Sequence, residues 1–195
     1  SLPKGSIQEY IVKPAPELIG ILSEAYPCPA FSGACMGMRW DPKAGHIPRG
    51  FLGATGSLDQ VEVVLVFAEP GDPKPGDHET LGQSLSHAYQ SFKFGNGAFH
   101  QKARLFLDLC WPGLSFDEQL KRVWMTESVL CSAARTTGPV PIEVERECAD
   151  RYLRRQLGLF PGALVVALGG KARHRLARAG ISGFLEAHAF GLPGC

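Results

Sequence analysis

Four of the six cysteines have the arrangement of a metal site. Sixteen residues separate Cys131 from Cys148, and six separate Cys28 from Cys35. Four thiolates from two separated pairs could hold a tetrahedral zinc ion or an iron–sulfur cluster. Such a centre would tie the irregular N-terminal part of the chain to the rest of the fold. The alternative is that these cysteines are free and buried, as is expected of Cys110 in LFLDLCW.

A run of basic residues near the C-terminal end is a second candidate for chemistry. No acidic residue interrupts it, although the net charge of the whole chain is only +1. A basic stripe in a neutral protein suits a polyanion such as nucleic acid. The alternative is a solvated helix face. The stripe consists of Lys171, Arg173, His174, Arg175 and Arg178.

Length and composition limit the class of protein. The chain has 195 residues, of which 45% are hydrophobic and 20% charged, so it is neither disordered nor a solvated tail. We expect a single domain over residues 1–195. No apolar run reaches the ~18 residues of a membrane span, and the N-terminus lacks the pattern of a secretory signal. We therefore expect a soluble, cytoplasmic monomer with no membrane partner.

The elements that must position these residues alternate between strands and helices. That order predicts a three-layer α/β/α fold with a central, mainly parallel four-stranded sheet. Ligands of such sheets bind outside the carboxyl ends of the strands. A long loop over residues 27–56 is expected to carry Cys28 and Cys35. The expected strands are 61–68, 123–130, 163–170 and 184–189, and the expected helices are 14–26, 99–110, 142–160 and 171–179.

Several of these segments together resemble the iron–sulfur branch, families 4 and 5, of the uracil-DNA glycosylase superfamily. That branch has a strand ending in Gly-Glu-Ala-Pro-Gly, a later strand running into a cysteine, a helix with Glu-x-x-x-Cys, and a last strand ending in glycine. The counterparts here are FAEPGD (67–72), ESVLCSAARTTGPVP (127–141), Glu143 or Glu145 before Cys148, and LVVALGGKA (164–172). The resemblance covers roughly residues 25–190. It departs in the first cysteine pair, which is C-x6-C where the family usually has C-x2-C.

The resemblance implies a DNA glycosylase that hydrolyses the N-glycosidic bond of uracil, or of a related deaminated base, during base excision repair. Its partner would be single- or double-stranded DNA. Its cofactor would be a structural [4Fe–4S] cluster held by Cys28, Cys35, Cys131 and Cys148, with zinc as the alternative. The reaction flips the base into a pocket. It is helped by a carboxylate near the sugar and by a hydrogen-bond donor to the base.

The resemblance also assigns the catalytic roles. Glu69 falls on the position that is the catalytic aspartate of Gly-Gln-Asp-Pro-Tyr in the best-known branch, and Asp72 is a second carboxylate that could serve water. HAFGL (188–192) is similar to a degenerate His-Pro-Ser-Pro-Leu. His188 would then donate to the uracil O2, and Leu192 would wedge into the base stack.

The remaining assignments concern the base and the phosphates. Phe94 is expected to stack on the flipped base, beside Pro70 and Gly71 of the first motif. Glu127 or Ser128 occupies the place of an asparagine that reads the uracil edge. Since a glutamate could accept from a base N–H, a different damaged base remains open. Phosphates are expected to meet Arg49, Lys171, Arg173 and Arg175.

Two other interpretations remain. The first is a glycosylase-fold protein that binds nucleic acid or a partner without excising a base. The divergent Phe67 and Ala68 of the first motif, and the missing asparagine, favour it. The second is an unrelated α/β enzyme whose zinc ion has three protein ligands and an open position for water.

Overall fold

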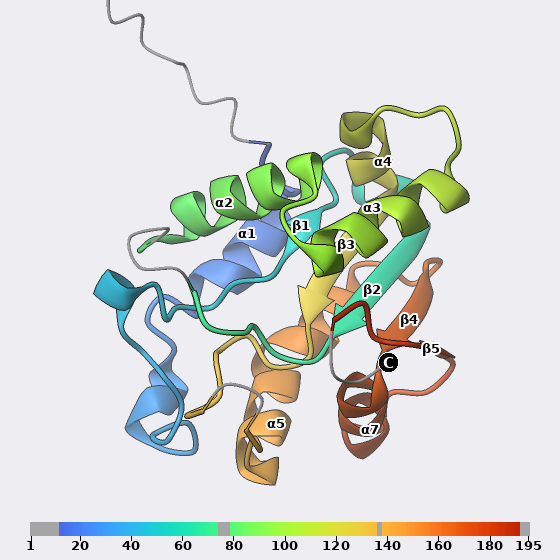
Figure 1. Ribbon diagram of the computed structural model, residues 1–195. Helices are drawn as coiled ribbons and strands as arrows, with labels where there is room; N and C mark the ends of the chain where they lie inside the picture. The colour runs from blue at the N-terminus through green and yellow to red at the C-terminus, as the bar shows by residue number, and fades with distance from the viewer. Residues whose placement is uncertain (1–11, 74–78, 136–137, 192–195) are drawn as a thin grey trace, which may run out of the picture.

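One five-stranded sheet organises the protein, and a computed structural model describes its residues 12–73, 79–135 and 138–191. The strand order is β1-β3-β2-β4-β5, and only β1 runs antiparallel to its neighbour (Figure 1). This confirms the expected mainly parallel sheet and adds the two-residue β1, which is too short to give a sequence pattern. The strands are β1 Leu52–Gly53, β2 Val63–Phe67, β3 Val123–Glu127, β4 Leu164–Leu168 and β5 Leu185–Ala187.

The sheet forms where the sequence has β-branched and apolar runs. β2 lies between β3 and β4, and its residues 64–67 are all buried. All five residues of β3 are buried as well. Such strands read as continuous apolar runs because helices cover both faces of a parallel sheet. All three residues of the edge strand β5 are exposed.

The helices occupy the expected places, with two additions. Those predicted over 14–26, 99–110, 142–160 and 171–179 are present, the third with a short π-helical stretch, Ala149–Leu153, in the middle. Helices α2 and α4 were not predicted. No helix of the described residues is long and apolar enough to cross a membrane. The bounds are α1 Pro16–Ser23, α2 Leu81–Phe94, α3 Ala98–Cys110, α4 Phe116–Arg122, α5 Ile142–Cys148, α6 Arg154–Gly158 and α7 Gly170–Arg178.

Helix α2 begins and ends at specific local signals. Its first turn has a capping box, in which Thr80 accepts from the Gln83 backbone N–H and the Gln83 side chain accepts from the Thr80 N–H. It ends at Gly95, which has a φ of 63°, the left-handed conformation that glycine adopts without strain. Because many residues inside the helix are polar, the capping box and the terminal glycine indicate this helix more clearly than its apolar periodicity does.

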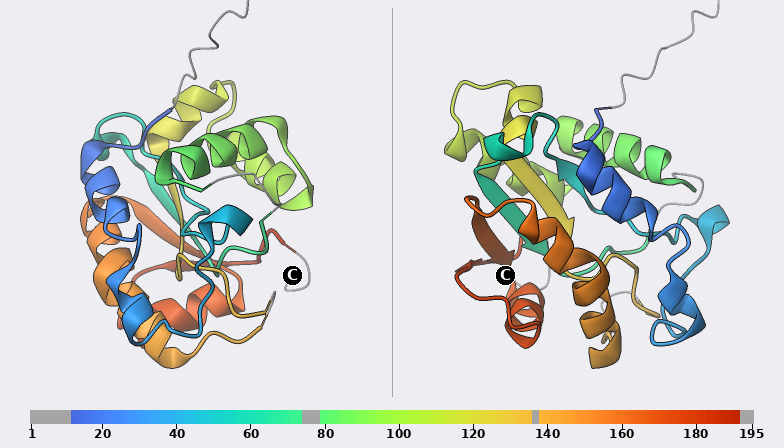
Figure 2. Two further views of the ribbon diagram at one scale, coloured as in Figure 1. Left: turned by 90° about the vertical axis from the view of Figure 1, so that its left-hand side faces the viewer. Right: turned by 180° about the vertical axis from the view of Figure 1, so that it is seen from behind.

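Two apolar cores lie on the two faces of the sheet, which gives three α/β/α layers (Figure 2). On one face, side chains of α1, α5 and α7 pack with Val64, Val66 and Trp124. On the other face, side chains of α2, α3 and α4 pack with Leu65 and Met125. The neighbouring residues of each strand therefore point into opposite cores. The carboxyl ends of β2, β3 and β4 all lie at one edge of this sandwich.

Candidate active site and cysteine pocket

A cavity of about 990 Å³ lies at the carboxyl ends of β2, β3 and β4. Parallel sheets bind their ligands at this edge. The strand order also reverses between β2 and β4, because β3 lies on one side of β2 and β4 lies on the other side. The segment 67–73 after β2 and the segment 168–171 after β4 form two of its walls. Side chains of α2 and α3 and the residues 189–191 complete it.

Glu69 lines this cavity directly after β2, where the sequence predicts a catalytic acid. Its side chain is only 8% exposed. Lys171 Nζ donates to Glu69 Oε1. Arg175 Nη1 lies 2.6 Å from Oε2. The second contact is an ion pair without an aligned hydrogen bond, because Arg175 Nη1 donates to other acceptors. Glu69 is thus a carboxylate held between two cations at the cavity wall.

Glu127, the last residue of β3, also lines the cavity and is 6% exposed. Its Oε2 is buried and has no hydrogen-bond partner among the described residues. Burial raises its pKa well above the ordinary value, and the charge of Glu69 adds to the rise. Gly50, with a φ of +89°, lies so close that a Cβ there would be 2.5 Å from Glu127 Oε1. The backbone therefore approaches this carboxyl only because residue 50 is glycine.

Arg175 is buried, with 4% of its side chain exposed, and this corrects its assignment to DNA binding. It lies on the face of α7 that packs into the core, next to Leu176. Its Nε donates to Glu145 Oε1 at 2.9 Å, and its Nη1 donates to Ala68 O at 2.7 Å. Arg175 is thus a positioning residue that joins α7 and α5 to the end of β2.

Ser128 does not line the cavity, which corrects its assignment to base binding. Its Oγ donates to Ala68 O at 2.6 Å and accepts from Arg175 Nη1 at 3.2 Å. Because Ala68 follows β2 and is itself bound by Arg175, these contacts join the end of β3 to the end of β2. Of the two candidates for reading the base edge, only Glu127 has access to the cavity.

Arg49, predicted to contact a phosphate, lines the cavity and is only 9% exposed. Its guanidinium donates to the backbone carbonyls of Gly45, Ile47 and Gly71. Burial lowers its pKa, and Glu127 is the largest opposing influence. A guanidinium bound to three carbonyls holds the loop after β2 in place instead of facing solvent.

Three other residues of the stripe have acidic partners, whereas His174 contacts Arg173. Lys171 pairs with Glu69, Arg173 Nη1 lies 3.2 Å from Glu186 Oε2, and Arg178 pairs with Glu145. Lys171 and Arg173 are both 44% exposed at their side chains and are still accessible to a phosphate. Only Lys171 of the stripe lines the cavity.

His188 is exposed and is not among the residues that line the cavity, so the structure gives no support to its role as the donor to the base. It follows β5, and residues 189–191 after it do line the cavity. Leu192, the expected wedge, lies outside the described residues.

Phe94 is 69% exposed at the end of α2 and does not line the cavity, which corrects the expected stacking residue. Phe99, from the first turn of α3, lines the cavity instead. Its ring centroid lies 5.0 Å from that of Phe67 in an edge-to-face contact. Phe99 is half-buried at the cavity wall, whereas Phe92, which also lines the cavity, is buried.

Three further predicted residues are at the cavity. Pro70, Gly71 and Asp72 follow Glu69 along its wall. Asp72 is exposed, and its Oδ1 accepts from Arg39 Nη1 at 2.5 Å. The first motif therefore contributes a continuous wall, with one carboxylate buried and the other near solvent.

Two histidines of the cavity were missed by sequence reasoning. His87 comes from α2 and His100 from α3. His100 Nδ1 lies 2.6 Å from Asn96 O, so Nδ1 carries the proton and Nε2 is the acceptor of the neutral ring. Burial lowers the pKa of His100 and favours that neutral form. The capping box of α2 is the sequence signal that could have placed His87 on a helix facing the sheet.

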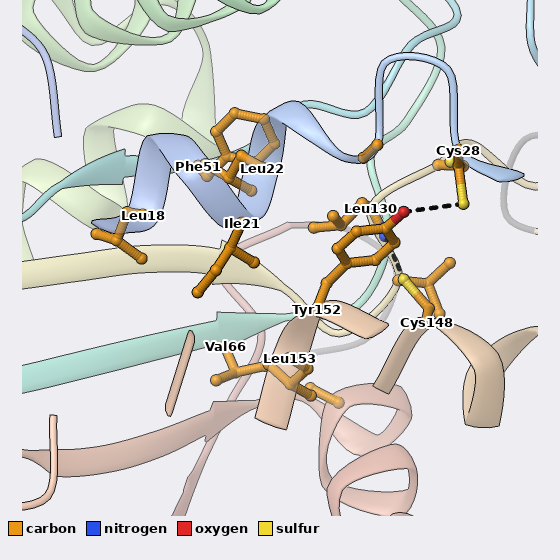
Figure 3. Close-up of a cluster of buried hydrophobic side chains, with 14 of the residues drawn as sticks. Leu18, Ile21, Leu22, Cys28, Phe51, Val66, Leu130, Cys148, Tyr152 and Leu153 are labelled. Atoms are coloured by element: carbon orange, nitrogen blue, oxygen red, sulfur yellow. Dashed lines mark hydrogen bonds between the residues drawn. The ribbon is translucent and has the colours of Figure 1, made fainter. Parts of the chain in front are cut away.

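The four candidate ligand cysteines line a second, small cavity. Cys28 and Cys35 come from the loop after α1, Cys131 follows β3, and Cys148 ends α5. All four are buried, whereas Cys110, expected in the core, is exposed. Figure 3 shows two hydrogen bonds to the sulfurs: Tyr152 Oη donates to Cys28 Sγ at 3.0 Å, and the Leu130 N–H donates to Cys148 Sγ at 3.4 Å.

The donor set of this pocket fits a thiolate-ligated metal centre. Burial raises the pKa of Cys35 to about 11 and that of Cys148 to about 12, and the nearby thiols add to both shifts. Cys35 and Cys148 would ionise together only if a cation compensated their charge. Among the described residues, no group of three or more His, Cys, Asp or Glu side chains has the geometry to hold a metal ion, so the fit rests on the chemistry of the donors and not on their positions.

No family model matches this chain, and no curated protein matches it either. The fold and its two sites define an α/β protein with a carboxylate-bearing cavity at the ends of its central strands and a separate pocket of four buried cysteines.

Proposed function

We propose that this protein is a DNA glycosylase of the uracil-DNA glycosylase superfamily, which removes uracil or a related deaminated base from DNA. The observation that carries the proposal is the position of Glu69. This residue follows the central strand, sits 8% exposed in the wall of a cavity of about 990 Å³, and is held between Lys171 and Arg175. The parallel sheet and the FAEPGD motif at its edge support the same fold family.

The proposed reaction needs little more than charge and positioning. The flipped nucleotide enters the cavity, its C1′–N bond breaks, and the bonding electron pair leaves with the base. The Glu69 carboxylate stabilises the cationic sugar and accepts a proton from the water that adds at C1′. Lys171 and Arg175 fix the orientation of that carboxylate. Phe99 supplies a ring for stacking of the base.

We further propose that Cys28, Cys35, Cys131 and Cys148 hold a [4Fe–4S] cluster, with a zinc ion as the alternative. The support is that two pairs distant in sequence line one pocket, despite the unusual spacing of the first pair. The metal centre would stabilise the fold and would take no part in breaking the glycosidic bond. It would join the loop after α1 to α5. The hydrogen bond from Tyr152 Oη to Glu24 O already links the end of α1 to the π-helical stretch that follows α5.

Incubation with oligonucleotides that contain one uracil tests the proposal directly. Single- and double-stranded substrates are treated with the protein and then with alkali, which cleaves abasic sites. We expect cleavage at the uracil and none in a matched thymine strand. Intact strands with uracil, hypoxanthine and xanthine, under all conditions, would contradict the proposed activity.

A nucleic-acid-binding protein that excises no base is a second candidate. The observation that favours it is the exposure of His188 outside the cavity, which removes the donor expected for the departing base. Binding that weakens steeply with salt, without release of any base, would identify this function. The same oligonucleotides serve for both measurements.

A further inference from the structure

Glu127 is a buried acid at the wall of the large cavity, where charged side chains such as Arg49, Glu69 and Lys171 also lie. Its carboxyl is 6% exposed, and Oε2 makes no hydrogen bond to any described residue. An unpaired buried polar atom costs free energy unless a ligand or water satisfies it. Because Glu127 lines the cavity, a molecule that enters the cavity can reach this carboxyl.

The groups around Glu127 favour its neutral form. Glu69, from the segment after β2, is the acid that faces it and raises its pKa. Arg49, from the loop before β1, and Arg175, from α7, act in the opposite direction. Arg49, however, donates to three carbonyls, and Arg175 donates to Glu145, Ala68 and Ser128. When two acids share a site and one of them has the cations, the other keeps its proton.

We propose that Glu127 is a neutral carboxylic acid that recognises the edge of the flipped base, donating its O–H to a ring carbonyl and accepting the adjacent ring N–H. The inference rests on the proposed function and deepens it by naming a specificity-determining residue. A protonated carboxyl presents one donor and one acceptor side by side, as a side-chain amide does. Glu127 can therefore replace the missing asparagine.

The neutral acid selects a class of ligand. Uracil and hypoxanthine each present a ring N–H beside a ring carbonyl, which matches the pair of groups on a carboxylic acid. An ionised Glu127 would have only acceptors and would repel the carbonyl oxygen, most strongly as the departing base becomes anionic. The O–H donor instead stabilises the charge that develops on that oxygen. This pairing separates uracil and hypoxanthine from cytosine and adenine, whose corresponding ring nitrogens in DNA carry no hydrogen.

Infrared spectroscopy of the full-length protein tests the protonation state without requiring activity. At pH 7 we expect a carboxylic-acid C=O band that is absent from E127Q and retained in E79Q, a change at an exposed glutamate outside the cavity. Free uracil, hypoxanthine and xanthine are then added one at a time. We expect at least one of these bases to shift the band, because it accepts the Glu127 O–H. Absence of the band, or a band that none of the bases shifts, overturns the inference.

Excision assays add a second readout. E127Q keeps both hydrogen-bonding groups and is expected to lower excision less than tenfold, whereas E127L is expected to lower it roughly 10²-fold or more. Equal losses in the two variants, with native circular dichroism, contradict the inference. A wild-type protein that excises none of the bases refutes the proposed function, while the infrared band and its shift still decide the role of Glu127.

Discussion

The large cavity and the cysteine pocket differ in how the charge of their acidic groups is compensated. At the large cavity, the acid Glu69 lies against Lys171 and Arg175, so the charges are compensated before any ligand arrives. In the cysteine pocket, the sulfurs of Cys28 and Cys148 accept hydrogen bonds only from neutral groups of the described chain. The first site therefore holds its carboxylate in a compensated state before a ligand binds. In the second, where Arg151 at the pocket wall is paired with Glu147, the proposed metal centre would supply the positive charge.

The largest expected effect is the loss of the cysteine centre. C131S/C148S removes two of the four sulfurs, and because metal binding contributes directly to folding, we expect loss of bound metal and a fall in stability of several kcal/mol. Iron and zinc analysis, visible absorbance and thermal unfolding measure these effects. C110S is the matched control, since Cys110 is exposed and outside the pocket. Full metal content and an unchanged Tm in the double variant would remove the contrast between the two cavities.

The next largest effect is expected at the compensated acid. E69Q keeps the size of the side chain and removes its charge, so we expect excision to fall about 10²–10⁴-fold. E79Q is the matched control, because Glu79 is exposed and does not line the cavity. Circular dichroism and Tm establish that both variants are folded. Activity of E69Q within tenfold of the wild type would show that the acid at this edge is structural.

A smaller effect is expected from the aromatic wall. F99L retains an apolar side chain of similar size but no ring, and we expect uracil excision to fall about tenfold, in line with the cost of losing one stacking contact. F94L changes an exposed ring that does not line the cavity and should stay within twofold. Excision kinetics at several substrate concentrations compare the two variants. The reverse order of effects would return the stacking role to Phe94.

Strand ends were the most predictable part of the site. The β-branched run 61–68 stops before Glu69, so the sequence places this acid at the sheet edge. The expected strand 123–130 runs three residues past Glu127, which is the last residue of β3 in the structure. The four cysteines could be assigned to one candidate site from their spacing. Cys131 directly follows an expected strand, and Cys148 lies within an expected helix. The roles predicted for the basic side chains were harder to obtain from sequence, and that of Arg175 was wrong. Sequence shows that the segment 171–178 is basic, but not that Arg175 points inward to acids from two other elements.

Helix α2 shows the other limit of sequence reasoning. Its residues LGQSLSHAYQSFKF carry too few apolar side chains for a clear helical period, and the tertiary contact with the sheet face stabilises it. Without α2, the wall that contains His87 could not be foreseen, and Phe94 could not be recognised as its exposed last residue. The capping box at Thr80 and Gln83 and the terminal Gly95 are the sequence signals that mark this element.

A last prediction concerns stability instead of excision and tests whether Glu127 is uncompensated among the described acids of the large cavity. Below pH 4 the acid is protonated in both the folded and the unfolded chain and has no effect on stability. As the pH rises, it ionises in the unfolded chain but keeps its proton in the folded chain, because its folded pKa is raised. Wild-type stability therefore falls relative to E127Q, by up to about 1.4 kcal/mol per pH unit, until the pH reaches the folded pKa.

Chemical denaturation of the wild type and E127Q from pH 4 to pH 8 measures this difference. We expect the gap to widen steadily in favour of E127Q, whereas E79Q should track the wild type because Glu79 is exposed. A gap that stays constant would mean that Glu127 ionises alike in both states. Arg49 and Arg175 would then compensate it as Lys171 and Arg175 compensate Glu69, and the large cavity would hold two balanced acids instead of a charged acid beside a neutral one.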